Sequence, residues 1–172
     1  DMIRSLFRFF LIGIAFFAIR ISAFAQQPLL KNGGFEGGGG SDGKGGGVPY
    51  WLPFEAGYDV DRVVFHTGEQ AIRCDVTRPD KRRGASVVIP LEQSRPLPVL
   101  VSGWSRADSV SGVRDTDYSL YIDITYQDGT PLWGQVVPFG VGTHDWEKRQ
   151  ILIHPQKPIK EMRLYALFRN HI

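Results

Sequence analysis

Large apolar residues recur at every second position in the segment from Asp117 to Gly129, D-Y-S-L-Y-I-D-I-T-Y-Q-D-G, which ends in an Asp-Gly turn. Because successive side chains of a β-strand point to opposite sides of the sheet, this alternation predicts a half-buried strand. One face is apolar and consists of Tyr118, Leu120, Ile122, Ile124 and Tyr126. The other face places the ring of Tyr121 beside the carboxylate of Asp123, a combination that can grip a polar ring. The segment therefore indicates a binding surface rather than a reaction centre.

The chain around this segment carries strand signals at short, regular spacing. Turns rich in Gly, Pro and Asp separate further candidate strands at 59–65, 70–76, 85–91, 97–106, 134–139, 147–154 and 162–169, and the central strand covers 119–127. After residue 26 we find no sustained helical periodicity and no internal repeat, and ten prolines from Pro49 to Pro158 would disrupt most helices. This organisation predicts an all-β fold, an antiparallel β-sandwich.

The N-terminus has the layout of a secretory signal peptide. Arg4 and Arg8 precede an apolar run over 9–19, and Ala23-Phe24-Ala25 fits a small-x-small cleavage pattern. A retained membrane anchor is the alternative, although the run is shorter than the roughly 20 apolar residues that span a bilayer. We expect a leader at 1–25 and one domain at 26–172, which would be secreted or periplasmic and free of the membrane after cleavage.

Composition narrows the choice of function. The net charge of +2 includes the arginines of the leader, so the domain is close to neutral and gives no electrostatic reason to expect nucleic acid as a partner. Cys74 is the only cysteine, which excludes an internal disulfide, and its apolar neighbours favour a buried structural thiol. The glycine-rich stretch at 37–47 predicts a flexible loop and lacks the residues of a phosphate-binding loop.

Five short motifs occur in an order that carries a resemblance. They are N-G-G-F-E at 32–36, H-T-G-E-Q-A-I-R at 66–73, S-G-W-S-R-A at 102–107, Y-S-L-Y-I-D-I-T-Y-Q-D-G-T at 118–130 and H-D-W-E-K-R at 144–149. With them the chain resembles the jelly-roll carbohydrate-binding modules attached to xylanases and related bacterial glycosidases, which have a galactose-binding-like fold. The resemblance extends over nearly all of 26–172 and implies a jelly roll.

The resemblance also implies a structural calcium ion near the start of the domain. It maps the ligands onto the side chain of Glu36 and onto backbone oxygens around Gly68 and Glu69, and such hard oxygen donors suit calcium. The usual last ligand of the family is an Asp on a final strand, whereas this sequence reaches R-N-H-I without it. We therefore expect a jelly roll that lacks its last strand, either as a fragment or because the fold closes differently. A simple cap or pairing role for Glu36 is the alternative.

Side chains that combine rings with hydrogen-bonding groups are the candidates for carbohydrate binding. They are Trp104, Arg106, Tyr121, Asp123 and Tyr165 on mixed strand faces, with Trp51 from a loop. We expect the strand residues to share one open face. Trp104 in the core and an Arg106–Asp123 cross-strand ion pair are the structural alternatives. We interpret Trp133 and Trp146 as structural.

Three hypotheses for function follow. The first is a secreted, non-catalytic module that docks on a polysaccharide or glycan, as part of a larger glycosidase-type protein. The second is a structural or adhesive jelly-roll module that binds a protein or a cell-surface partner. The third is a small glycoside hydrolase, which needs two carboxylates at a controlled separation. Its candidates are Asp115, Asp117, Asp123 and Asp128, and their spacing alone does not pair them. The oligomeric state does not follow from the sequence.

Overall fold

The structure is a computed structural model that describes residues 28–38, 47–78 and 80–172. The predicted leader at 1–25 and most of the glycine-rich loop lie outside the described residues. The described residues form strands and turns without a helix, and their strands are β1 (Leu52–Glu55), β2 (Asp59–Asp61), β3 (Ala71–Arg73), β4 (Arg82–Pro90), β5 (Val99–Val110), β6 (Tyr118–Tyr126), β7 (Pro131–Pro138), β8 (Gly142–Ile153) and β9 (Ile159–Arg169). It follows that no described segment is a helix long and apolar enough to cross a membrane.

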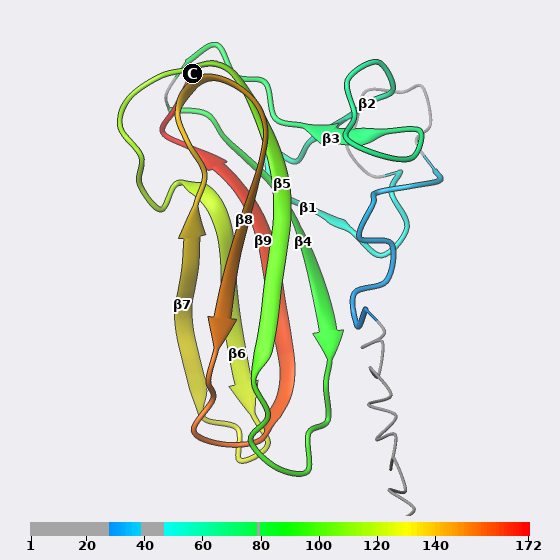
Figure 1. Ribbon diagram of the computed structural model, residues 1–172, viewed down its shortest axis with the longest axis vertical. Coiled ribbons are helices and arrows are strands. Elements are labelled where there is room, and N and C mark those ends of the chain that lie inside the picture. The colour runs from blue at the N-terminus through cyan, green and yellow to red at the C-terminus, as the bar shows by residue number, and fades with distance from the viewer. Residues whose placement is uncertain (1–27, 39–46, 79) are drawn as a thin grey trace, which may run out of the picture.

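The strands form two layers, so the predicted antiparallel β-sandwich is confirmed. One layer is a five-stranded antiparallel sheet in the order β1-β4-β9-β6-β7. The other layer contains the long β5–β8 pair, which crosses in front of this sheet in Figure 1, and the short β2–β3 pair lies to one side of it. The two short sheets are not hydrogen-bonded to each other in the described part of the chain.

Apolar side chains from both layers form the core. The predicted inward face of β6 is confirmed, because Ile122 and Ile124 are fully buried and Leu120 is nearly so. On β4 and β9 the alternate residues that face the same way are also buried: Ala85, Val87, Ile89, Met162 and Leu164. The second layer contributes Val99, Val101 and Ile153 to the same core. The alternation of each strand therefore separates a core face from an outer face.

Among the strand predictions, the one at 59–65 was too long, and the strand β1 was missed. The candidate strand at 59–65 ends at Asp61, because the Asp61 carboxylate accepts the N–H groups of Val63 and Val64 at 2.8 and 2.9 Å. Such a side-chain turn diverts the backbone from a sheet ladder. The sequence interpretation also missed β1, a four-residue strand at the edge of its sheet that contains Pro53. A proline is tolerated there because one side of an edge strand needs no ladder hydrogen bonds.

A hollow lies between β5 and the segment that contains β3. Residues 102–108 and 70–76 both line this cavity of about 590 Å³, and core residues such as Leu120 and Leu164 form its floor. Within the described residues, β5 pairs with β8 alone and β3 with β2 alone. The facing edges of β3 and β5 therefore remain unpaired in the described part of the chain, with the hollow between them.

Candidate functional site

The predicted binding residues lie on opposite outer surfaces of the sandwich. Gly103 faces the core, because a Cβ placed on it would lie 3.0 Å from a methyl carbon of Leu120 on β6. Its neighbour Trp104 therefore points away from the core on the outer side of β5. Tyr121 is the neighbour of Leu120 and points away on the outer side of the five-stranded sheet. The expectation of one shared face was therefore wrong.

Tyr121, Asp123 and Tyr165 come together on the outer side of the five-stranded sheet. Tyr121 is directly opposite Tyr165, with ring centroids 5.9 Å apart in an edge-on arrangement, and Phe54 meets Tyr165 in the same way at 4.8 Å. The Asp123 carboxylate accepts the N–H of Gly134 at 3.1 Å. Burial, followed by the nearby Asp123 carboxylate, raises the pKa of the Tyr121 hydroxyl. These rings pack on one another and offer edges more than flat faces.

Trp51 is buried, so its predicted role as a binding residue was wrong. Only 4% of its surface is exposed. Its indole N–H donates to the carbonyl oxygen of Asn32 at 3.0 Å, and its ring lies 4.6 Å from that of Phe35. An indole with a satisfied N–H and an apolar ring partner is a stable core residue. Trp51 thus anchors the N-terminal segment to the domain.

Trp104 is the exposed ring of the second layer. Its side chain is 46% exposed, and His66 from the turn between β2 and β3 stacks on it at 4.2 Å with an interplanar angle of 22°. Trp146, in the first half of β8, also contacts His66, and the two rings lie 5.4 Å apart and nearly perpendicular to each other. The structural alternative that Trp104 belongs to the core is therefore excluded. The three rings form an aromatic cluster that partly faces solvent.

Two adjoining hollows surround this cluster and share Val64, Arg106 and Trp146 in their walls. One is the cavity beside β5 described above, which includes Trp104 and His66. The other is an open depression of about 590 Å³ lined by residues 63–65 and 143–146 together with Arg106. We call the two hollows and the aromatic cluster between them the Trp104 groove. Its walls include residues of β5, of β8 and of the turn after β2.

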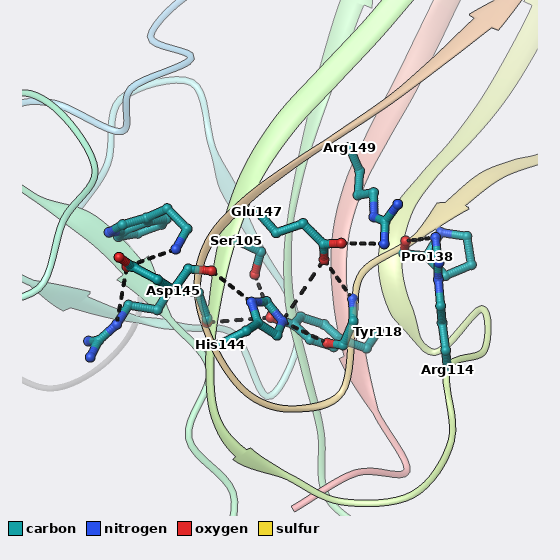
Figure 2. A network of polar contacts seen from close by, with 11 residues as sticks. Ser105, Arg114, Tyr118, Pro138, His144, Asp145, Glu147 and Arg149 are labelled. Carbon is teal, nitrogen blue, oxygen red and sulfur yellow. Dashed lines mark hydrogen bonds and ion pairs between the residues drawn. The ribbon is translucent and has the colours of Figure 1, made fainter.

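A polar network fixes the start of β8 beneath the groove, and Figure 2 shows its members close together. The Glu147 carboxylate accepts the N–H of Gly140 at 2.8 Å and pairs with the Arg149 guanidinium. Partial burial raises the pKa of Glu147, but the Gly140 N–H and the nearby Arg149 and His144 outweigh it, so the pKa is lowered overall. The turn from Gly140 to His144 is thereby held in one position.

The same network continues onto β5 and sets the neighbours of Trp104. Ser105 points inward, and its hydroxyl is 2.5 Å from that of Tyr118 on β6. Asp145 accepts the N–H of Trp146 at 2.8 Å, and its carboxylate is 3.9 Å from the Arg106 guanidinium. The alternative Arg106–Asp123 ion pair does not form, since these residues lie on different layers. Arg106 instead borders the groove.

The residues predicted for calcium meet, but their geometry is that of a hydrogen-bonded turn. Both carboxylate oxygens of Glu36 accept the N–H of Glu69, at 3.3 and 3.1 Å. Gly68 has a φ of 77°, and a Cβ there would lie 1.9 Å from a Glu36 oxygen, so only glycine fits under the carboxylate. As placed, these residues do not fit a calcium ion, which needs six to eight oxygen ligands. No group of three or more His, Cys, Asp or Glu side chains that could hold a metal ion occurs at 28–38, 47–78 or 80–172.

Sequence reasoning missed two members of the cluster and one other exposed ring. The only sequence signal for His66 was its position in the H-T-G-E turn. Trp146 was interpreted as structural. Trp133, also interpreted as structural, is 61% exposed on β7 at the edge of the other layer. Contacts across 38 residues, as between His66 and Trp104, leave no trace in local alternation.

Comparisons with known proteins give partial similarities. No family model matches the chain. A tRNA nuclease WapA of Bacillus subtilis (strain 168) and a tRNA3(Ser)-specific nuclease WapA of Bacillus spizizenii are each 33% identical over 77 residues. The match covers 44% of this chain, and the chain spans only 3% of the length of these curated relatives.

Among solved structures, the comparison finds "Family 16 Carbohydrate Binding Module-2". The match has a TM-score of 0.45 and 12% sequence identity, and it covers 66% of this chain and 77% of that chain.

Proposed function

We propose that the domain binds carbohydrate in the Trp104 groove. The observation that carries the proposal is the Trp104 ring, which is 46% exposed and yet held in place by its stack on His66. An exposed large ring in a groove is a surface on which the apolar C–H face of a sugar can lie, and holding it rigid lowers the entropic cost of binding. The S-G-W-S-R-A motif that contributes to the sequence resemblance contains both Trp104 and Arg106.

Hydrogen-bonding groups around the ring support the same proposal. Ser102 precedes Trp104 by two residues on β5, and its cross-strand partner on β8 is Gln150, so both lie on the outer face. Arg106 borders the groove from the other direction. A hydroxyl, an amide and a guanidinium beside a flat ring are the groups that orient sugar hydroxyls.

A non-catalytic role is part of the proposal. Three of the four acids considered for hydrolysis have charged or amide side-chain partners: Asp115 bonds His171, Asp117 bonds Asn170 and Asp128 bonds Lys157. Asp123 accepts the N–H of Gly134 within the five-stranded sheet, on the layer that does not carry Trp104. Such engagement favours structural roles over acid–base chemistry. The tRNA cleavage named for the curated relatives is favoured by no observation on the described residues. Export within a larger glycosidase-type protein rests on the leader-like residues and the sequence resemblance.

Glycan binding by the purified domain tests the proposal. A glycan array followed by calorimetry should identify a ligand, and Trp104→Ala should weaken its binding at least about tenfold, since buried aromatic anchors commonly carry more than 1 kcal/mol. Trp133→Ala is the matched control because it removes an exposed tryptophan from the other layer. It should bind like the parent. Absence of binding to any glycan, or equal losses in both variants, would overturn the proposal.

A protein partner is the second candidate function. It is favoured by the exposed apolar turn at 63–65, where Val63 is 89% exposed and Phe65 is 37% exposed. Exposed apolar residues next to a groove are typical of protein contacts as well as of ligand sites. Retention of a defined protein partner that is lost in Val63→Ser, together with no response to glycans, would favour this function.

A further inference from the structure

We infer that the Trp104 groove selects acidic sugars, with the carboxylate of a uronate seated between Lys148 and Arg106 while the sugar ring lies on Trp104. The inference rests on the proposed function and names its ligand class. It follows from the charges that border the ring, and the sequence resemblance contributes nothing to it.

Lys148 is the first of the two charges. It is the cross-strand partner of Trp104 on β8, and it is exposed. Directly opposite residues of an antiparallel pair place their Cβ atoms about 4.5–5.5 Å apart on the same face. The Lys148 side chain forms no hydrogen bond or ion pair with the part of the chain that the structure describes. Its ammonium group is therefore free to reach an anion that rests against the indole.

Arg106 is the second charge, and its existing partner is weak. Its guanidinium is 3.9 Å from the Asp145 carboxylate, beyond hydrogen-bond distance, and the Asp145 side chain is 91% exposed. Exposed pairs at such distances contribute little to stability. The Asp145 carboxylate is also occupied by the N–H of Trp146. A guanidinium with a loose partner can turn towards a ligand carboxylate and form two parallel hydrogen bonds with it.

The acids of the surroundings do not cancel these charges. Glu147 is bound to Arg149 and to the Gly140 N–H, and Asp61 accepts two backbone N–H groups while it faces Arg73 at 3.6 Å. Asp145 and Asp108 are the exposed acids nearest to Arg106 along β8 and β5, and Asp108 accepts the hydroxyl of Ser109. The face of Trp104 is thus flanked by one unpaired and one loosely paired cation.

Matched pairs of oligosaccharides test the inference on the intact domain. We would measure binding of tetramers of galacturonate, glucuronate and mannuronate, each beside its carboxyl-reduced neutral counterpart, at low and high salt. In at least one pair the acidic tetramer should bind about tenfold more tightly than the neutral one at 50 mM NaCl, because charged hydrogen bonds are the stronger ones. The difference should shrink at 500 mM NaCl, because salt screens exposed charges.

Charge-neutralising variants complete the design. Lys148→Gln should remove most of the acidic preference while neutral binding persists. Arg106→Gln should also lower the acidic preference, and it should weaken neutral binding as well, because Arg106 belongs to the proposed site. Lys160→Gln, which removes an exposed lysine from β9 in the other layer, should keep the preference. Thermal unfolding like that of the parent confirms that each variant is folded. Glycan binding without acidic preference would overturn this inference and leave the proposed function intact. Absence of binding to acidic and neutral glycans alike would overturn the proposed function itself.

Discussion

Cys74 lines the hollow beside β5 and is half-buried. Its burial, only partly offset by the positive charge of Arg83, raises the pKa of the thiol to about 12. Because the thiolate is the reactive form, this thiol is inert at neutral pH even though it is the sole cysteine of the chain. The predicted structural role of Cys74 agrees with this environment.

Alkylation tests the environment of Cys74. At pH 8 iodoacetamide should modify the native domain very slowly, since roughly one thiol in ten thousand is ionised when the pKa is about 12. Unfolding in urea should restore the rate of an ordinary cysteine. Mass spectrometry of timed samples gives both rates, and rapid modification of the native domain would contradict the burial of the thiol.

Glu36 ties the N-terminal segment to the H-T-G-E turn through the N–H of Glu69. Glu36→Ala should lower the free energy of unfolding by about 1–2 kcal/mol, because a charge-assisted hydrogen bond is lost. The loss should be the same in EDTA and in millimolar calcium if the turn is held by this bond. A loss that appears only with calcium, read from thermal unfolding, would instead support the metal site that the sequence resemblance implies, which stays a prediction.

The four tryptophans show what alternation can and cannot predict. Trp104 lies on the outer face of its strand, as its position in 97–106 indicates. Trp51 stands in a Pro-flanked segment, and its burial depends on Asn32, 19 residues away, which no local pattern reveals. Trp133 and Trp146 begin strand segments and were interpreted as structural, yet one is exposed and the other borders the groove.

At the scale of elements, the short β2–β3 pair positions the turn that carries His66. A brace holds it to the five-stranded sheet: Arg83 on β4 donates to the Asp59 carboxylate at 2.7 Å and to the carbonyl oxygen of Gly57 at 3.0 Å. The hydrogen bond from Arg83 is the main reason that the pKa of Asp59 is lowered. This ion pair is thus one of the contacts that place one wall of the groove, beside the packing of Val60 and Ile72 against the core.

Removal of this brace should destabilise the domain in a pH-dependent way. Arg83→Met should cost about 1 kcal/mol near neutral pH, since Asp59 is partly exposed. A carboxyl whose pKa is lowered by folding stabilises the fold above its unfolded value, near 3.9, and loses that contribution as the pH falls through the folded value. The gap between parent and variant in the free energy of unfolding, measured in urea, should therefore narrow as the pH falls below the unfolded value. The lost hydrogen bond from Arg83 to the carbonyl oxygen of Gly57 should keep part of the gap at every pH. A gap that stays constant down to pH 2 would contradict the role of Asp59.

Most strands could be predicted from the sequence, whereas their assignment to layers could not. Period-two alternation determines which residues of one strand share a face, and it did so correctly for β6. It does not determine which strands become neighbours, so it could not place Trp104 and Tyr121 on opposite surfaces. The β2 strand was predicted too long because the Asp61 side-chain turn competes with the sheet ladder. Pairing partners come from the tertiary fold, which one strand's pattern does not contain.

At the scale of the whole molecule, the two layers are unequal. The five-stranded sheet has β9 and β6 at its centre, each paired on both sides, whereas the opposing layer consists of two separate pairs in the described residues. Cooperative stability follows the density of buried contacts, so local opening should begin in the short pair β2–β3.

Hydrogen exchange should report this gradient. Amides of β9 and β6 should exchange most slowly, those of β5 and β8 at intermediate rates, and those of β2 and β3 fastest. Exchange followed by NMR or mass spectrometry gives the order directly. If β2 and β3 were as protected as β9, the small pair would have to be an integral part of the core.

The unpaired edge of β5 gives the groove a wall of main chain. Peptide N–H and C=O groups on that edge have no partner strand among the described residues, so in the free domain they are hydrated. A ligand that enters beside Trp104 exchanges with this water, and its own hydroxyls can take over the vacated positions. Part of the recognition would then be carried by the polypeptide backbone, which no side-chain replacement can remove. Even a complete alanine scan of the groove should therefore leave part of the affinity for the ligand.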